Sequence, residues 1–274
     1  MSPKRVKMSL RAWVLFACAS SAATAQDAGS VAKSPDAQDV PQTGFVADAK
    51  AYFTAPLHWD EKDWLYFGGT LAAIAASHHY DDQVRRHFTT GQYAGNLTSQ
   101  SSSEGKDAIP AVAAVAATWV YASFIEDNNG RREAAEMVEA AVLSGATTVV
   151  LRLGIGRERP NETDDSNRWG AGSNSLPSLH STAAFAIGTV LAESGSDDVR
   201  WIRRVLGYGL GAFTSYQRLK HNAHWLSDTV AGAGLGIATA HFVMNRHAHP
   251  DYSSSFNVMP IEGGAMLTYS ATFP

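Results

Sequence analysis

Long stretches rich in alanine, valine and leucine, separated by short polar breaks, fill most of the chain from about residue 60 onward. Apolar runs of this length with helical periodicity are typical of α-helices and not of strands. The pattern predicts an all-α protein whose main helices, about six in number, pack into a single bundle. The predicted helices cover residues 62–78, 107–126, 131–154, 178–193, 198–217 and 224–246.

Two longer breaks interrupt this pattern. Residues 90–106 are rich in Gly, Ser and Asn and are predicted to form a surface loop, and residues 158–176 have no helical periodicity. Loops this long within a compact domain are usually functional or disordered. Beyond the last helix, the runs Phe256–Met259 and Ala265–Phe273 flank a Glu-Gly-Gly turn. They predict a short C-terminal β-hairpin, with a frayed tail as the alternative.

The N-terminus has the pattern of an export signal. Basic residues precede a short apolar run, Ala12–Ala19, and Ala23–Ala25 is a small-x-small cleavage site. The apolar run is too short to span a bilayer. We therefore predict a signal peptide over residues 1–25 and an exported protein, located in the periplasm, whose mature chain begins near Gln26.

The remaining organisation follows from composition. Residues 26–44 are polar and rich in Ala, Asp, Ser and Pro, which predicts a flexible leader. Residues 45–250 form the predicted helical domain, and residues 251–274 form the hairpin or tail. The single cysteine, Cys18, lies in the signal, so the mature chain would have no disulfide, thiolate metal site or cysteine nucleophile.

Charge and hydropathy limit the partners. A net charge of −4 argues against nucleic-acid binding, which needs a basic face. Ala108–Ile125 is apolar enough to raise the question of a membrane span. Pro110 and the low mean hydropathy of −0.15 favour instead a soluble or peripheral bundle that buries these faces against each other. Contact with a membrane surface stays open, and the sequence does not indicate an oligomeric state.

A first cluster of basic residues ends an apolar stretch. Arg152 and Arg159, which precedes Pro160, are seven residues apart, or two helical turns, so both would face one pocket. Arg157 lies between them. Three crowded arginines are costly without an anion between them. A solvated helix end is the alternative.

A second block, Pro177-Ser178-Leu179-His180, is predicted to open a helix, with the proline in its first turn. Free N–H groups and the positive end of the helix dipole form a natural phosphate cradle there. Ser178 adds a hydroxyl donor and His180 an imidazole. A structural histidine near a helix start is the alternative for this block taken alone.

A third block contains Arg218, His224 and Asp228. His224 and Asp228 are four residues apart, so on a helix they share one face and can hydrogen-bond. A carboxylate on one ring nitrogen fixes the tautomer and leaves the other nitrogen as a nucleophile. Arg218 would clamp phosphate from the end of the preceding helix. A surface His–Asp pair is the alternative.

With these blocks the sequence resembles the type 2 phosphatidic acid phosphatases and their vanadium haloperoxidase relatives. The family pattern reads K-x6-R-P, then P-S-G-H, then S-R-x5-H-x3-D. This chain has R-x6-R-P at Arg152–Pro160, P-S-L-H at Pro177–His180 and Q-R-x5-H-x3-D at Gln217–Asp228. The resemblance therefore extends over roughly residues 150–230.

The resemblance implies a phosphatase that hydrolyses phosphate monoesters, with either a lipid phosphate such as phosphatidic acid or a soluble organic phosphate as substrate. It implies that His224 attacks phosphorus and becomes phosphohistidine, that Asp228 orients it, and that His180 protonates the leaving oxygen. No metal or other cofactor is implied. The matching phosphate-binding positions are Arg152, Arg159, Ser178, Leu179 and Arg218.

Three departures from the family pattern keep alternatives open. Arg152 replaces a lysine, Gln217 replaces a serine, and Leu179 replaces a glycine that lets the backbone approach phosphate closely. The alternatives are a vanadate-dependent haloperoxidase and a catalytically degenerate, anion-binding envelope protein.

Two further polar clusters, His78–Asp82 and His247–Asp251, contain metal-ligand residue types. Adjacent residues on a helix point about 100° apart. We therefore predict that both are solvated helix ends.

Overall fold

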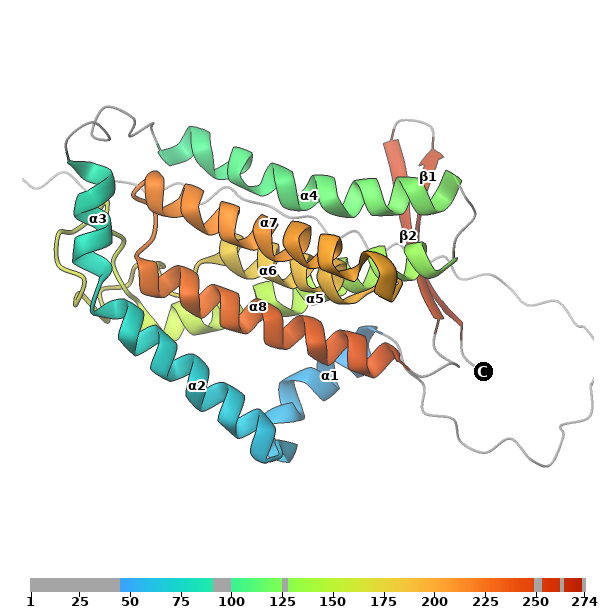
Figure 1. The fold of residues 1–274 in the computed structure, drawn as a ribbon, viewed down its shortest axis with the longest axis horizontal. Coiled ribbons are helices and arrows are strands. Elements are labelled where there is room, and N and C mark those ends of the chain that lie inside the picture. Colours follow the sequence, from blue (N-terminus) through green and yellow to red (C-terminus); the bar gives the residue numbers. More distant parts are fainter. Residues whose placement is uncertain (1–44, 91–99, 125–127, 249–252, 262–263, 273–274) are drawn as a thin grey trace, which may run out of the picture. The chain divides into compact units, whose positions relative to one another are not determined.

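The computed structural model describes residues 45–90, 100–124, 128–248, 253–261 and 264–272. The predicted signal peptide and leader lie outside these residues. The described residues include eight α-helices, shown in Figure 1. Their bounds are α1 (Phe45–Thr54), α2 (Glu61–His78), α3 (Asp81–Thr89), α4 (Gln100–Phe124), α5 (Asn128–Ile155), α6 (Leu179–Glu193), α7 (Arg200–Lys220) and α8 (Leu226–His247).

The predicted all-α architecture is confirmed, and the six predicted helices correspond to α2 and α4–α8. Asp60 caps α2 as a capping box, because its carboxylate accepts the Asp63 N–H at 2.9 Å while Asp63 accepts the Asp60 N–H. Two short 3₁₀ segments, Ala55–His58 and Asp197–Val199, precede α2 and α7.

The sequence did not predict α1 or α3, and the predicted loop 90–106 is wrong in its second half. Helix α4 begins at Gln100, so residues 100–106 are helical, while residues 91–99 lie outside the described part. The first turns of α4 are polar. Apolar periodicity, the signal used for prediction, is therefore missing there although the backbone is helical.

Helix α6 forms the centre of the bundle and packs against α5, α7 and α8 (Figure 1). Its buried face consists mainly of small residues, including Ala184, Ala186 and Val190. The α6–α7 contact is especially close, since a Cβ at Gly188 would lie 2.2 Å from the Gly207 carbonyl oxygen. Glycine is thus required at this crossing.

After α8 the backbone continues as strands β1 (Ser253–Ile261) and β2 (Gly264–Thr272), which pair antiparallel. The surroundings of their side chains lie outside the described residues. The C-terminal hairpin therefore stays a prediction.

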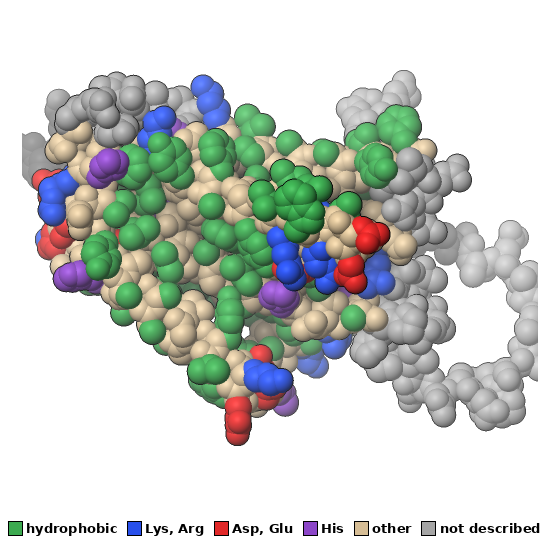
Figure 2. All heavy atoms as spheres, viewed as in Figure 1, with side chains coloured by type: hydrophobic (Ala, Val, Ile, Leu, Met, Phe, Trp, Pro, Cys, Tyr) green, Lys and Arg blue, Asp and Glu red, His purple; other side chains and the backbone are tan. Residues whose placement is uncertain are grey.

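Several helices leave large apolar side chains exposed, which contradicts the expectation that these faces are buried against each other. Helix α2 has no buried residue at all, although it contains Trp64, Leu65 and Phe67. Figure 2 shows apolar side chains spread over the face that carries α2, α4 and α7. On α7 the exposed residues include Trp201, Ile202, Val205, Leu206 and Phe213.

Ala108–Ile125, the segment for which the sequence raised the possibility of a membrane span, is not the candidate that the structure gives. By length and composition alone, the one helix in the described part of the chain that could cross a membrane is α5, over Asn129–Ile155. Only 28% of its most apolar window is buried inside the protein.

Candidate active site

Four helix ends meet at one end of the bundle: the end of α5, the start of α6, the end of α7 and the start of α8 (Figure 1). The long loop after α5 covers residues 156–178 and is non-helical, as predicted for 158–176. The Ser178 N–H donates to the Asp228 carbonyl at 3.0 Å, which ties the start of α6 to that of α8. The three sequence blocks are thereby brought to this end of the fold.

His224 and Asp228 form the predicted pair, although they do not share a helix. Helix α8 begins at Leu226, so His224 lies in the turn before it. Its Nδ1 is 3.5 Å from Asp228 Oδ2, and the residue is only 3% exposed. Neither ring nitrogen makes a hydrogen bond within the described part of the chain, so the contact of Nδ1 with Asp228 is one of ion-pair distance. This leaves one ring nitrogen directed at a carboxylate and the other available for chemistry.

Asp228 is fixed by donors from three directions. Its Oδ2 accepts the Ser175 hydroxyl at 2.5 Å and the Trp225 N–H at 2.9 Å, and its Oδ1 accepts Arg157 Nη1 at 2.7 Å. The side chain is fully buried. A carboxylate held in this way can orient the imidazole without moving itself.

The environment keeps this pair in the form of a neutral imidazole and a carboxylate. Burial lowers the pKa of His224 to about 3, against the influence of Asp228, and the charges of Arg218 and Arg159 lower it further. Burial would raise the pKa of Asp228, but its contacts with His224 and Arg157 outweigh this effect and lower it. An unprotonated imidazole is the form that can act as a nucleophile.

Two of the three predicted arginines, Arg218 and Arg159, lie close enough to His224 to affect its pKa, and the third, Arg152, contacts the segment before α6. Arg218 is fully buried in the last turn of α7, as expected, and its Nη1 donates to Asp107 of α4 at 2.7 Å. Arg159 lies in the loop, with its Nε donating to Asn174 Oδ1 at 3.0 Å. Arg152 lies in the last turn of α5 and donates through Nε to the Pro177 carbonyl at 2.7 Å.

The helical spacing used to pair Arg152 with Arg159 is incorrect. Helix α5 ends at Ile155, and Gly156 turns the chain with a φ of 60°, a conformation that favours glycine. Arg159 therefore does not continue the helix face of Arg152. Both nevertheless hydrogen-bond to the segment 174–177, because the loop returns past them.

The second block is shifted by two residues from its predicted place. Ser178 is the N-cap of α6, so Pro177 lies before the helix and not in its first turn. Leu179 is the first helical residue, and its N–H is among those that lack an intrahelical acceptor. Its side chain lies toward Gly145 of α5, 3.6 Å from where a Cβ would be. His180 follows and is half-buried.

Arg157 is the central residue that the sequence analysis left without a role. It is 1% exposed and joins two buried carboxylates, donating to Asp228 and, through Nη2 at 2.7 Å, to Asp81 of α3. Its guanidinium lies 4.4 Å from the centre of the Trp169 ring. The only signal for it was its place between Arg152 and Arg159.

Asp81 also corrects the interpretation of His78–Asp82 as a solvated helix end. Asp81 is 1% exposed, accepts the Ser227 N–H at 2.8 Å and lies 2.8 Å from His78 Nδ1. Asp107, which holds Arg218, was likewise missed. Local sequence could not show that either aspartate pairs with a buried arginine, because Arg157 and Arg218 are more than 70 residues away from them.

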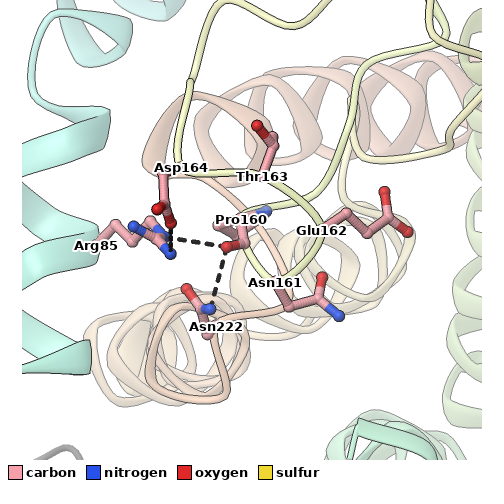
Figure 3. A pocket seen from close by; sticks show the side chains of 7 residues that line it. All are labelled: Arg85, Pro160, Asn161, Glu162, Thr163, Asp164 and Asn222. Carbon is pink, nitrogen blue, oxygen red and sulfur yellow. Dashed lines mark hydrogen bonds and ion pairs between the residues drawn. The ribbon is translucent and has the colours of Figure 1, made fainter.

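A pocket of about 410 Å³ lies between α3, the loop after Arg159 and the turn after α7, and none of the predicted site residues lines it. Figure 3 shows Arg85 and Asn222 converging on the Pro160 carbonyl, at 3.0 and 3.2 Å, with Arg85 also paired with Asp164. The pocket borders both Pro160 of the first block and Asn222, which is two residues before His224.

A sequence-family model described as "PAP2 superfamily" matches residues 133–249. The chain carries a PAP2 superfamily domain. The match includes all three sequence blocks and the helices that position them. Among curated proteins, the chain is 26% identical over 167 residues to a lipid A 1-phosphatase of Porphyromonas gingivalis. The similarity covers 61% of this chain, which spans 35% of the relative. No solved structure matches the chain.

Proposed function

We propose that this protein is a phosphatase that hydrolyses phosphate monoesters of lipids through a phosphohistidine at His224. The observation that carries the proposal is the state of the His224 ring: buried, neutral, directed at Asp228 through Nδ1 and without a hydrogen bond at Nε2. A buried polar atom without a partner is costly unless a ligand completes it. The PAP2 superfamily domain supports the same activity.

In the proposed reaction, His224 Nε2 donates an electron pair to phosphorus while the bond from phosphorus to the ester oxygen breaks. His180 gives that oxygen a proton, and the alcohol leaves. A water molecule then attacks the phosphohistidine and gives a proton to His180, the P–N bond breaks, and inorganic phosphate is released. Arg152, Arg159, Arg218, Ser178 and the Leu179 N–H would hold the phosphate oxygens, where their charge offsets that of the transition state.

Two features support a lipid substrate. The relative is named for acting on lipid A, which is a phosphorylated lipid. In addition, α2, α4 and α7 each expose several large apolar side chains, and exposed apolar patches mark membrane or protein contact sites. We infer that these faces contact a bilayer in the periplasm, where the predicted export signal would deliver the chain.

The test compares hydrolysis of p-nitrophenyl phosphate, a short-chain phosphatidic acid and lipid A by purified protein. We expect phosphate release by the wild type and a loss of at least about 10⁴-fold in His224→Ala. His58→Ala, which removes an exposed histidine, is the matched control. Loss of activity in a variant that remains folded supports a role of His224 in the chemistry, and trapping of ³²P on the wild-type protein but not on His224→Ala would show the intermediate.

Leu179→Gly separates activity from the degenerate alternative. If the wild type is inactive and Leu179→Gly hydrolyses the substrates, the natural site is degenerate. If His224→Ala retains wild-type turnover, the proposal is wrong. Activity on p-nitrophenyl phosphate but on neither lipid would keep the phosphohistidine mechanism and refute the lipid substrate.

A further inference from the structure

A second group of buried ionisable side chains lies far from the candidate active site. It consists of Asp48 of α1, Glu136 and Glu139 of α5, and His247 at the end of α8, each 5% exposed or less. His247 is 19 residues beyond Asp228 on the same helix. That separation corresponds to roughly 28 Å along the helix axis. None of these residues takes part in the chemistry proposed above.

The arrangement corrects the interpretation of His247–Asp251 as a solvated helix exit. His247 is fully buried, while residues 249–251 lie outside the described residues. It is instead surrounded by carboxylates from two other helices. This is an unusual concentration of negative charge for the interior of a protein.

The three nearest ligand atoms have the spacing of a metal coordination shell. His247 Nε2 lies 3.4 Å from Asp48 Oδ2 and 3.5 Å from Glu139 Oε2, and one ligand atom from each residue lies within 4.8 Å of the others. Zinc bonds to nitrogen and oxygen are about 2.1 Å long, so neighbouring ligands of a tetrahedral site are about 3.4 Å apart. The two measured separations from Nε2 match this value.

Glu139 provides an independent observation. Its side chain is 2% exposed, and neither of its carboxylate oxygens accepts a hydrogen bond from a described residue. A buried carboxylate usually has hydrogen-bond donors or a bound cation. Here Oε2 of Glu139 lies near the same nitrogen of His247 as Asp48 does.

The outer contacts orient the ligand atoms toward one centre. Arg246 Nε donates to Asp48 Oδ1 at 2.7 Å and leaves Oδ2 directed at His247. Glu136 Oε1 lies 3.6 Å from His247 Nδ1 and itself accepts Arg132 Nε at 2.9 Å. Metal-bound histidines typically present their other nitrogen to a carboxylate in this way.

An ion-pair network is the alternative, in which a protonated His247 is held by the surrounding carboxylates. A single proton on His247 Nε2 would have to serve both Asp48 and Glu139, at 3.4 and 3.5 Å. Both separations are longer than the 2.7–2.9 Å of a charge-assisted hydrogen bond. A cation bonded to all three atoms would account for these separations without requiring hydrogen bonds between them.

We propose that Asp48 Oδ2, a carboxylate oxygen of Glu139 and His247 Nε2 bind one divalent cation of the zinc class, with water at a fourth position. Imidazole combined with carboxylates favours such an ion over Mg²⁺ or Ca²⁺. Asp48 is the one buried residue of α1. The cation would therefore attach α1 to α5 and α8 and have a structural role.

The test measures zinc in the full chain after dialysis against a weak chelator, by elemental mass spectrometry. We expect one Zn²⁺ per chain, and a melting temperature that rises by about 5–10 °C at a hundredfold excess over Kd. Glu139→Gln and Asp48→Asn should each weaken zinc binding at least a hundredfold. Glu133→Gln, which changes a partly buried glutamate on the same helix, should bind zinc like the wild type.

Two outcomes overturn the proposal: wild type that retains well under one zinc per chain at micromolar free Zn²⁺, or variants that bind zinc as the wild type does. The second outcome would place the ion on surface histidines. If Glu139→Gln fails to fold, Asp48→Asn and the metal content of the wild type still decide the matter.

Discussion

Arg157→Met tests whether the site depends on the buried contact between Asp81, Arg157 and Asp228. The guanidinium donates to each carboxylate at 2.7 Å, and all three side chains are fully buried. Methionine fills much of the same volume but leaves two carboxylates facing each other. Removing one partner of a single buried ion pair costs about 3–5 kcal/mol. We therefore expect a loss of at least that size, or a melting temperature lower by about 6–20 °C.

The assay combines chemical unfolding with p-nitrophenyl phosphate turnover at a temperature where the variant remains folded. Asp228 would lose its Oδ1 donor, so the orientation of His224 should relax and kcat should fall more than KM changes. Arg157→Met leaves the carboxylates of Asp81 and Asp228 without their arginine. The double variant Arg157→Met/Asp81→Asn removes one of these two charges and should recover part of the stability. A loss below about 1 kcal/mol in the single variant would refute the assignment of Arg157 as the link between these carboxylates.

Two further predictions concern pH and packing. Because the pKa of His224 falls from 6.5 to about 3 on folding, the unfolded chain binds more protons below pH 6.5, so stability should fall between pH 6.5 and pH 3. In urea unfolding at several pH values, His224→Gln should reduce this decline by roughly 3–5 kcal/mol, and an unchanged pH profile would contradict the buried neutral imidazole. Gly188→Ala should destabilise the protein by about 2 kcal/mol or more, since its Cβ would meet the Gly207 carbonyl. Gly209→Ala, where nothing lies within 4 Å, should be neutral or stabilise by up to about 1 kcal/mol; equal unfolding midpoints would show that α6 and α7 are not in close contact.

Local sequence determined most of the helices. Apolar periodicity located six of them, and Asp60, directly before α2, is a residue type that favours a helix start. These signals are local because helix hydrogen bonds join residues only four apart. The same rule explains the failures: α1 and α3 are short, and the first turns of α4 are polar, so none carried a clear apolar stripe.

The sequence also identified the residues of the candidate site, but not how the backbone holds them. Arg152 and Arg159 do not share a helix, and His224 lies outside the helix that carries Asp228. Each pair was inferred from helical spacing, whereas a loop and a turn produce the observed positions. A motif fixes the order and type of residues, and several backbone paths can bring such residues together.

Tertiary structure alone decided which charges are buried and with which partners. Arg157, Asp81 and Asp107 have no local pattern that separates them from solvated residues, and His247 was taken for a polar helix exit. Their burial depends on contacts with residues more than 70 positions away along the chain. A charge enters the interior only where folding supplies an opposite charge or a donor. Those partners come from other segments of the packed bundle, so no single segment of the sequence reveals which charges are buried.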